Sequence, residues 1–409
     1  MRSQLVSVNL DAVPFSGVIA AATARPFEPG HAINLVRNGV IFDVMEEELA
    51  RARVHIHIVM YIWKPGKASD RVLAVLAERR RAGIPVRIVV DRLGCRGGFT
   101  DEVLPKLEEM GCEVKLFHVP GRVGLAKSAS RNHRKIVVVD GRVGIAGGWC
   151  LWDKFLGNGR AREEWRDINV RVRGPCVRFM QQAFLENWRE CGGVLPPPHQ
   201  LPWPDQNAGD LPCTFVHSSG GEPGTPKARA LVRALLPSAQ RRLWISCAYF
   251  APDDEQVELL RARAKAGIDV RVLVPGPIHD VPPVREAGRA VYAPLLEAGV
   301  RIWEYQPSML HSKSMVVDEG LCVVGSINLE PMSLNVLEEA SVLFWSAEHA
   351  DRLAADFEED ASYSKEITRE TIPAPALKPI RGAVRNASAA FASMVRMWRR
   401  GDRVSGLGA

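Results

Sequence analysis

The chain has 409 residues, of which 46% are hydrophobic and 24% charged, and this ordinary globular composition argues against disorder. The length predicts about two domains, and the net charge of +6 permits anionic partners without identifying one. No uncharged apolar run reaches about 18 residues, so a membrane-spanning helix is not predicted. The eight cysteines are scattered without a Cys-x-x-Cys pattern or a Cys/His cluster, so neither a zinc site nor a disulfide framework is predicted.

The N-terminal stretch is weakly apolar between Ala12 and Ala24. It lacks a leucine-rich segment, and Asp11 stands where a signal peptide carries basic residues, so a secretory signal is not predicted. If the substrate is a lipid, the protein must therefore reach the membrane peripherally.

The first half predicts alternating strands and helices. Residues 54–63 and 83–91 have the pattern of strands, and residues 69–82 between them have helical periodicity. A helix and a short strand follow over residues 101–117. Two histidines, His55 and His57, alternate along the first strand, but without a third ligand nearby we favour a hydrogen-bonded strand face over a metal site.

The first chemical motif has the form His-x-Lys-x4-Asp. It consists of His133, Lys135 and Asp140, and a glycine pair, Gly147 and Gly148, follows. Because residues i and i+2 of a strand point to the same face, the imidazole and the ammonium group should lie side by side. The glycines would let backbone N–H groups approach a phosphate.

Aromatic residues follow this motif at Trp149, Trp152, Phe155 and Trp165. Core packing and an apolar entrance for acyl chains are both consistent with this cluster.

A Pro-rich stretch over residues 195–226 separates the two halves and should contain neither regular helix nor central strand. Beyond it the pattern repeats: a strand over 243–250, a helix over 253–266, a buried strand over 267–274, and a helix and short strand over 289–305. Shared order and spacing indicate a duplication and predict a mixed or parallel sheet covered on both sides.

The second half carries a second complete motif. Here His311, Lys313 and Asp318 are followed by a turn that contains Ser326 and Asn328, and the turn starts at the same distance from the aspartate as in the first half. The serine and asparagine side chains would add donors for a phosphate. Two copies at matching positions of a repeat make a chance match implausible.

Together the motifs suit transfer at a phosphodiester. One neutral imidazole can attack phosphorus, a second can protonate the leaving oxygen, and two lysines can stabilise the charge that develops on the non-bridging oxygens. This chemistry calls for no metal ion and no cofactor. A nucleophilic histidine also needs an acceptor on its other nitrogen, and Asp167 and Glu339 are the candidates. Asp140 and Asp318, although part of the motifs, are expected to end their strands and pair with cations.

We therefore predict an α/β protein of two similar lobes, each a mixed β-sheet flanked by helices. A pseudo-twofold axis would relate the lobes, with one active site at their interface. The predicted divisions are an N-terminal extension (1–29), lobe 1 (30–194), the linker (195–226), lobe 2 (227–372) and a basic tail (373–409).

The sequence resembles the phospholipase D superfamily, and more narrowly the short bacterial cardiolipin synthases without N-terminal membrane helices. The resemblance runs over about residues 38–344 and rests on both motifs, Tyr61-Ile62-Trp63, Trp165-Arg166-Asp167 and the run from Gly325 to Leu334. It implies phospholipase D-like lobes and a phosphohistidine intermediate, with His133 as nucleophile and His311 as general acid. The implied reaction converts phosphatidylglycerol into cardiolipin and glycerol. Trp149, Val59 and Leu337 depart from the pattern of the relatives, which leaves the acceptor alcohol open.

The predicted tail has the sequence features of a segment that binds a membrane surface. Six arginines and one lysine face a single acid, Asp402, between Lys378 and Ala409. Apolar residues from Val384 to Trp398 recur on one helical face, which favours a membrane surface over docking on the protein itself. We expect an anionic phospholipid substrate and a cytoplasmic protein held peripherally at the plasma membrane.

Three alternatives remain at this stage. A phospholipase D that hydrolyses or exchanges the headgroups of other phospholipids would use the same residues. A nuclease or other phosphodiesterase would also use them, but it would leave the amphipathic tail without a purpose. A non-catalytic lipid-binding scaffold is disfavoured because both motifs are complete. The sequence does not specify an oligomeric state.

Overall fold

The computed structural model describes residues 12–118, 130–219 and 224–372. The first half contains, in chain order, α1 (Ala12–Thr23), β1 (Glu28–Arg37), α2 (Val40–Ala50), β2 (Ile56–Met60), α3 (Lys67–Arg81), β3 (Val86–Asp91), a π-helical turn (Phe99–Val103), α4 (Leu104–Glu109), β4 (Glu113–Phe117), β5 (Ile136–Val139), β6 (Val143–Gly147), a 3-10 turn (Asp153–Phe155), β7 (Trp165–Arg166), β8 (Ile168–Arg173) and α6 (Val177–Glu190). A second 3-10 turn lies at Pro198–Gln200. The predicted tail, residues 373–409, lies outside the described residues.

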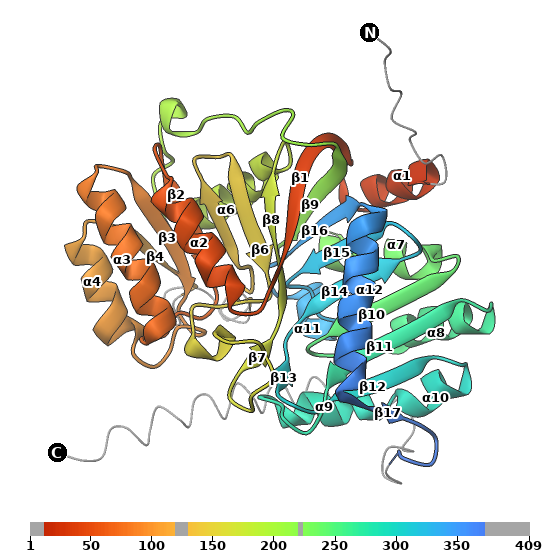
Figure 1. Cartoon of the computed structure of the whole chain (residues 1–409). Coiled ribbons are helices and arrows are strands. Elements are labelled where there is room, and N and C mark those ends of the chain that lie inside the picture. Colours follow the sequence, from red (N-terminus) through yellow and green to blue (C-terminus); the bar gives the residue numbers. More distant parts are fainter. Residues whose placement is uncertain (1–11, 119–129, 220–223, 373–409) are drawn as a thin grey trace, which may run out of the picture.

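The second half repeats this order. It contains β9 (Leu211–Ser218), α7 (Lys227–Ser238), β10 (Arg242–Cys247), α8 (Asp254–Lys265), β11 (Asp269–Pro275), α9 (Pro282–Arg289), α10 (Tyr292–Glu297), β12 (Arg301–Tyr305), β13 (Met309–Leu310), β14 (Lys313–Val317), β15 (Leu321–Gly325), α11 (Pro331–Asn335), β16 (Glu339–Trp345), α12 (Ala347–Ser362) and β17 (Ser364–Ile367). The predicted duplication is therefore present in three dimensions (Figure 1).

The strands of both halves join into one 15-stranded sheet rather than two separate ones. From its centre outward, the first half runs β1-β8-β6-β5-β2-β3-β4, and the second runs β9-β16-β15-β14-β10-β11-β12-β17. Within each half, β2-β3-β4 and β10-β11-β12 are parallel, and the remaining neighbours are antiparallel. The predicted architecture of two similar mixed α/β lobes is confirmed.

Helices cover both faces of the sheet (Figure 1). In the first lobe α2 and α3 pack on one face and α6 on the other, and in the second lobe α7 and α8 pack on one face and α12 on the other. Strands buried on both faces read as nearly continuous apolar runs, which is why β2, β3 and β5 show no polar alternation. The start of α8 follows from its sequence, because Asp253 and Gln256 form a capping box.

The prediction for the Pro-rich linker was wrong in part. Residues 211–218 form β9, a central strand that pairs with β16 over six residues and with β1. Pro212 is tolerated because it lies near the start of the strand, where a missing N–H costs little, and the run from Cys213 to His217 has strand-forming side chains. The extension before residue 30 also carries structure, since α1 packs on α7.

Candidate active site

Both His-x-Lys segments lie at the N-terminal ends of strands. His133 and Lys135 lie just before β5, while His311 precedes β14 and Lys313 is its first residue. Each lysine Nζ donates to the backbone carbonyl of its own histidine, so the two charged groups of each motif stay adjacent. All four side chains are buried.

The segment before each strand is held against the other lobe. The N–H of His133 donates to the Glu338 carbonyl (2.9 Å), and the N–H of Glu338 donates to the Arg131 carbonyl (2.9 Å). Equivalently, β13 pairs with β7, and the N–H of His311 donates to the Arg166 carbonyl (2.7 Å). The site is therefore built by two short backbone contacts between the lobes.

The two candidate orienting acids reach across this interface. His133 Nδ1 lies 3.0 Å from both carboxylate oxygens of Glu339, and His311 Nδ1 lies 3.4 Å from Asp167 Oδ2. Each histidine thus meets the acid from the other lobe, not the acid that follows it in its own half. The pairing arises because Asp167, between β7 and β8, and Glu339, the first residue of β16, lie next to the backbone contacts between the lobes.

Glu339 is held by hydroxyl groups. Ser326 Oγ donates to one carboxylate oxygen (2.5 Å) and Ser333 Oγ to the other (2.6 Å). The hydroxyl of Ser326 thus contacts Glu339, and the role of Ser326 as a phosphate ligand stays a prediction. Asn328 Oδ1 accepts the N–H of Tyr249 (3.1 Å), and its amide NH2 has no partner among the described residues. Of the side chains of Ser326 and Asn328, that of Asn328 thus keeps a donor that a substrate could use.

The glycine pair lets two side chains pack against the turn, and its contact with phosphate stays a prediction. The N–H of Gly148 donates to Asn169 Oδ1 (3.1 Å) and is not free. A Cβ on Gly147 would lie 2.1 Å from that same oxygen, and one on Gly148 would lie 2.6 Å from Asp167 Oδ2. These positions lack a side chain so that Asp167 and Asn169 can approach the turn.

The motif aspartates lie at the far ends of β5 and β14, seven residues and so roughly 20 Å from the histidines. Asp140 accepts the N–H groups of residues 53, 54 and 55, and Asp318 accepts those of residues 240, 241 and 242. No ion pair of either carboxylate occurs within the described part of the chain, so the predicted cation pairing was wrong. They fix the turns that lead into β2 and β10, and they do not reach the reacting groups.

The partners of the two histidines assign different tautomers to them. His133 Nδ1 faces a carboxylate, so it carries the proton and leaves the Nε2 lone pair free. His311 Nδ1 accepts from Lys313 Nζ at 3.0 Å, closer than the oxygen of Asp167, so the proton belongs on Nε2.

Burial sets the charge state of the site. Burial, with a smaller contribution from Lys135, lowers the pKa of His133 to about 4 against the opposing effect of Glu339, so its ring is neutral at neutral pH. Burial also lowers the pKa of Lys313 to about 8 and raises that of Asp167 to about 7. Burial, with contributions from Lys313 and Lys135, also lowers the pKa of His311, so its ring is neutral at neutral pH.

Two tyrosines flank the histidines and were missed, although they are offset by one position in the repeat, since Tyr61 corresponds to Ala248. The ring of Tyr61 lies edge-on to His133 (4.9 Å between centroids), and that of Tyr249 lies edge-on to His311 (6.2 Å). Lys135 Nζ lies 5.0 Å from the ring of Tyr61 and Lys313 Nζ lies 5.8 Å from that of Tyr249. Each tyrosine follows closely after the strand that pairs with its motif strand, β2 or β10, which is the signal that could have found it. No sequence signal marks Ser333.

The aromatic cluster is mostly core. Trp149 and Phe155 are buried, which excludes them from an acyl-chain entrance, and Trp165 packs 4.8 Å from the ring of His311. Only Trp152 is partly exposed. His55 and His57 are joined through Gln181 on a buried strand face, as favoured from the sequence.

The chain matches the family described as "Cardiolipin synthase, PLD-like domain" over residues 45–173 and 232–361, one segment in each lobe. A cardiolipin synthase of Geobacillus sp. (strain WCH70) is 32% identical and covers 81% of this chain and 66% of its own length. Cardiolipin synthase 1 of Bacillus anthracis is 31% identical and covers 81% of this chain and 67% of its own. The chain thus spans about two thirds of the length of these curated relatives.

A solved structure shares the fold. The phosphatidylserine synthase of Haemophilus influenzae Rd KW20 superposes with a TM-score of 0.67 at 13% identity, covering 96% of this chain and 99% of that one. Among the described residues no helix is long and apolar enough to cross a bilayer. With two matched segments and relatives at this identity, the chain belongs to the phospholipase D superfamily, in the cardiolipin synthase family.

Proposed function

We propose that this protein is a phosphatidyltransferase that converts two molecules of phosphatidylglycerol into cardiolipin and glycerol. The observation that carries the proposal is the pair of buried His-Lys groups, in which each histidine contacts an acid of the other lobe. The curated relatives at 31% and 32% identity are cardiolipin synthases, which favours this reaction over hydrolysis.

In the first step the free Nε2 of His133 attacks phosphorus, and the bond to the headgroup glycerol breaks. His311 gives its Nε2 proton to the leaving oxygen while Lys313 or Asp167 supplies a proton to Nδ1. Lys135, Lys313 and the amide of Asn328 stabilise the negative charge on the phosphoryl oxygens.

In the second step the hydroxyl of another phosphatidylglycerol attacks the phosphohistidine. His311 accepts the proton of that hydroxyl on Nε2 and returns its Nδ1 proton to Lys313 or Asp167, the P–N bond breaks, and cardiolipin leaves. Glu339 holds the Nδ1–H of His133 throughout and stabilises the ring as it gains positive charge.

The test is incubation of the purified protein with labelled phosphatidylglycerol vesicles and, in parallel, with single-stranded DNA. Cardiolipin and glycerol in equal amounts support the proposal. Phosphatidic acid as the sole product would assign the protein as a hydrolase, and cleaved DNA beside intact lipid would assign it as a nuclease.

Two variants identify the covalent step. His133→Gln should form no acid-labile phosphoprotein from labelled lipid. His311→Gln should lower kcat by about 10²–10⁴-fold, as expected for loss of a general acid. A labelled adduct in His133→Gln would reverse the assigned roles.

The site also implies contact with a membrane, since the substrate is a bilayer lipid. We propose that the protein associates peripherally with the cytoplasmic face of the plasma membrane through the basic residues 373–409.

A further inference from the structure

The two halves of the sheet meet at a single strand pair, β1 with β9. This seam is short and irregular: Glu28 pairs with Cys213 and His31 pairs with Leu211, with a register shift between them. By comparison, β1 pairs with β8 over six consecutive residues. The junction between the lobes thus has fewer backbone hydrogen bonds than its neighbours.

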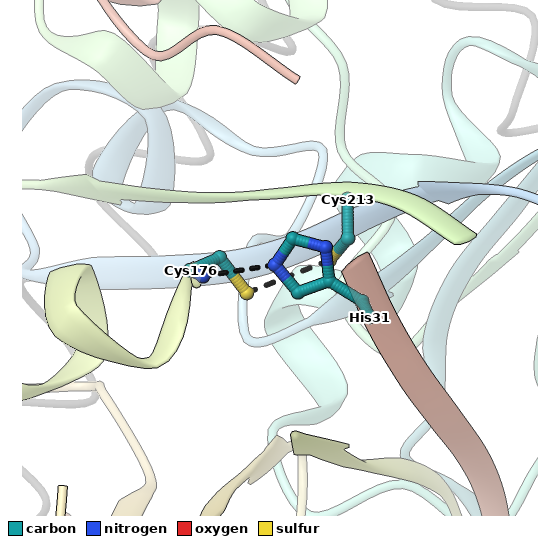
Figure 2. Close-up of side chains that lie close together, drawn as sticks. All are labelled: His31, Cys176 and Cys213. Carbon is teal, nitrogen blue, oxygen red and sulfur yellow. Dashed lines mark hydrogen bonds between the residues drawn. The ribbon is translucent and has the colours of Figure 1, made fainter. Parts of the chain in front are cut away.

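Three ligand-type side chains converge at this seam (Figure 2). They are His31 of β1, Cys176 at the start of α6 and Cys213 of β9, and all three are buried at 0% exposure. The two Sγ atoms lie 3.6 Å apart, and the three ligand atoms all lie within 4.8 Å of one another. His31 and Cys176 are 145 positions apart in the chain, and Cys176 and Cys213 are 37 positions apart. No spacing motif in the sequence therefore predicts this cluster.

The separation of the sulfurs fits coordination to a common ion. Zinc–sulfur bonds of about 2.3 Å at a tetrahedral angle place two sulfurs about 3.8 Å apart. A disulfide would need about 2.05 Å and would have no use for a buried imidazole. We propose that His31, Cys176 and Cys213 bind a thiophilic metal ion, with Zn²⁺ as the best match, that fastens the seam between the lobes.

The imidazole is already oriented for this role. Its Nδ1–H donates to the Leu211 carbonyl (3.2 Å), an arrangement that fixes metal-binding histidines in many sites and leaves Nε2 with its lone pair. Nε2 accepts the N–H of Cys176 (2.8 Å), and the ion would take the place of this hydrogen bond. A Cβ on Gly174 would lie 2.7 Å from the ring, so a glycine is needed to seat it.

Charge also favours a divalent ion. Each thiol releases its proton on binding, and two thiolates with one Zn²⁺ leave no net charge in a buried place. Three protein ligands leave the fourth position to water.

The proposed metal site lies away from the candidate active site. Cys176 follows the end of β8, whereas Asp167 precedes its start, so the length of the strand lies between the ion and the reacting groups. The ion would act on the stability of the lobe junction and would take no part in phosphoryl transfer.

The experiment loads the full-length, tag-free, reduced protein with Zn²⁺, removes the excess by gel filtration and counts the metal by mass spectrometry. Wild type should retain stoichiometric Zn²⁺, and its Tm should fall when a chelator removes the ion. Cys176→Ser and Cys213→Ser should retain none and should show a Tm that the chelator does not change. Cys322→Ser is the matched control, because Cys322 is buried in the same core, and it should behave as wild type.

A cobalt titration of the wild type covers the case in which the variants do not fold. Charge-transfer bands from thiolate to cobalt, together with intense absorption bands in the visible range, would support a tetrahedral site with sulfur ligands. Absence of those bands, a wild type that keeps no zinc, or the mass of a Cys176–Cys213 disulfide in its place would overturn the proposal.

Discussion

His133 and His311 occupy equivalent positions of a duplicated fold, yet their immediate neighbours differ. His133 faces a carboxylate that two serine hydroxyls hold in place, while His311 accepts a hydrogen bond from Lys313. A difference of this kind allows one ring to attack while the other carries a proton. Duplication supplied two similar groups, and single side chains around them separated the roles.

The orienting acids should consequently contribute unequally. Glu339→Gln should lower kcat by up to about 10⁴-fold, because an amide at this position no longer holds the Nδ1–H tautomer of His133. Asp167→Asn should cost less, since Asp167 lies 3.4 Å from His311 and Lys313 already makes the shorter contact. Steady-state kinetics on phosphatidylglycerol in mixed micelles measures both, and equal losses would contradict the assigned tautomers.

The pKa values give the pH dependence its sign. His133, with its pKa lowered to about 4, must be neutral to attack, so kcat/KM should fall as the pH drops toward that value. In the proposed mechanism Asp167 or Lys313 supplies a proton to His311, and their pKa values are about 7 and about 8. Both groups lose their protons as the pH rises through this range, so the rate should fall.

Lys313→Arg tests whether Lys313 causes the fall in rate at high pH, which is the alkaline limb of the pH profile. Arginine stays protonated throughout, so the limb should move to higher pH in the residual activity of this variant. A limb that does not move would show that another group controls it.

At the scale of elements, β5 and β14 each carry motif residues with different roles at their two ends. The histidine and lysine lie at one end, and the aspartate at the other binds three backbone N–H groups of the preceding turn. Asp140 and Asp318 also adopt positive φ (52° and 51°), which aspartate tolerates better than most residues. The motif thus combines catalysis with a turn that places β2 or β10 beside it.

Replacement of these aspartates should affect stability more than chemistry. Asp140→Ala and Asp318→Ala should each lower the free energy of unfolding by about 1–3 kcal/mol, because partly buried N–H groups lose their acceptor. The kcat of the folded fraction should change little. Denaturant unfolding with Asp140→Asn and Asp318→Asn as controls measures the effect, and an inactive variant of unchanged stability would restore these residues to the reaction.

At the scale of the whole molecule, neither lobe has a complete site. Each histidine takes its acid and part of its backbone pairing from the other lobe, so separation of the lobes would disconnect both ring nitrogens from their partners. The continuous sheet and the seam between β1 and β9 keep this interface in register.

Contact with the bilayer is assigned to the tail on sequence alone. Deletion of residues 381–409 should weaken sedimentation with anionic vesicles, while turnover of a short-chain soluble substrate should persist. Replacing Phe391 and Trp398 by serine keeps the charge and isolates the apolar contribution. Unchanged vesicle binding in the deletion would assign the tail to packing on the protein.

Much of this protein could be predicted from local patterns. Apolar runs at strand period, helical periodicity between them and two complete motifs predicted the element order, the duplication and the four residues His133, Lys135, His311 and Lys313. These features depend on neighbours in the chain, so the sequence alone determined them.

Other features depend on residues far apart in the chain. The crosswise pairing of Glu339 with His133, the commitment of Ser326 and Gly148 to positioning, the central place of β9 and the meeting of His31 with two cysteines all arise where separate segments pack together. Local spacing carries no information on such contacts, because the hydrogen bonds and burial that define them exist only after the lobes have joined. The sequence by itself determined which chemistry the protein carries, and the tertiary structure decided which partner each group has.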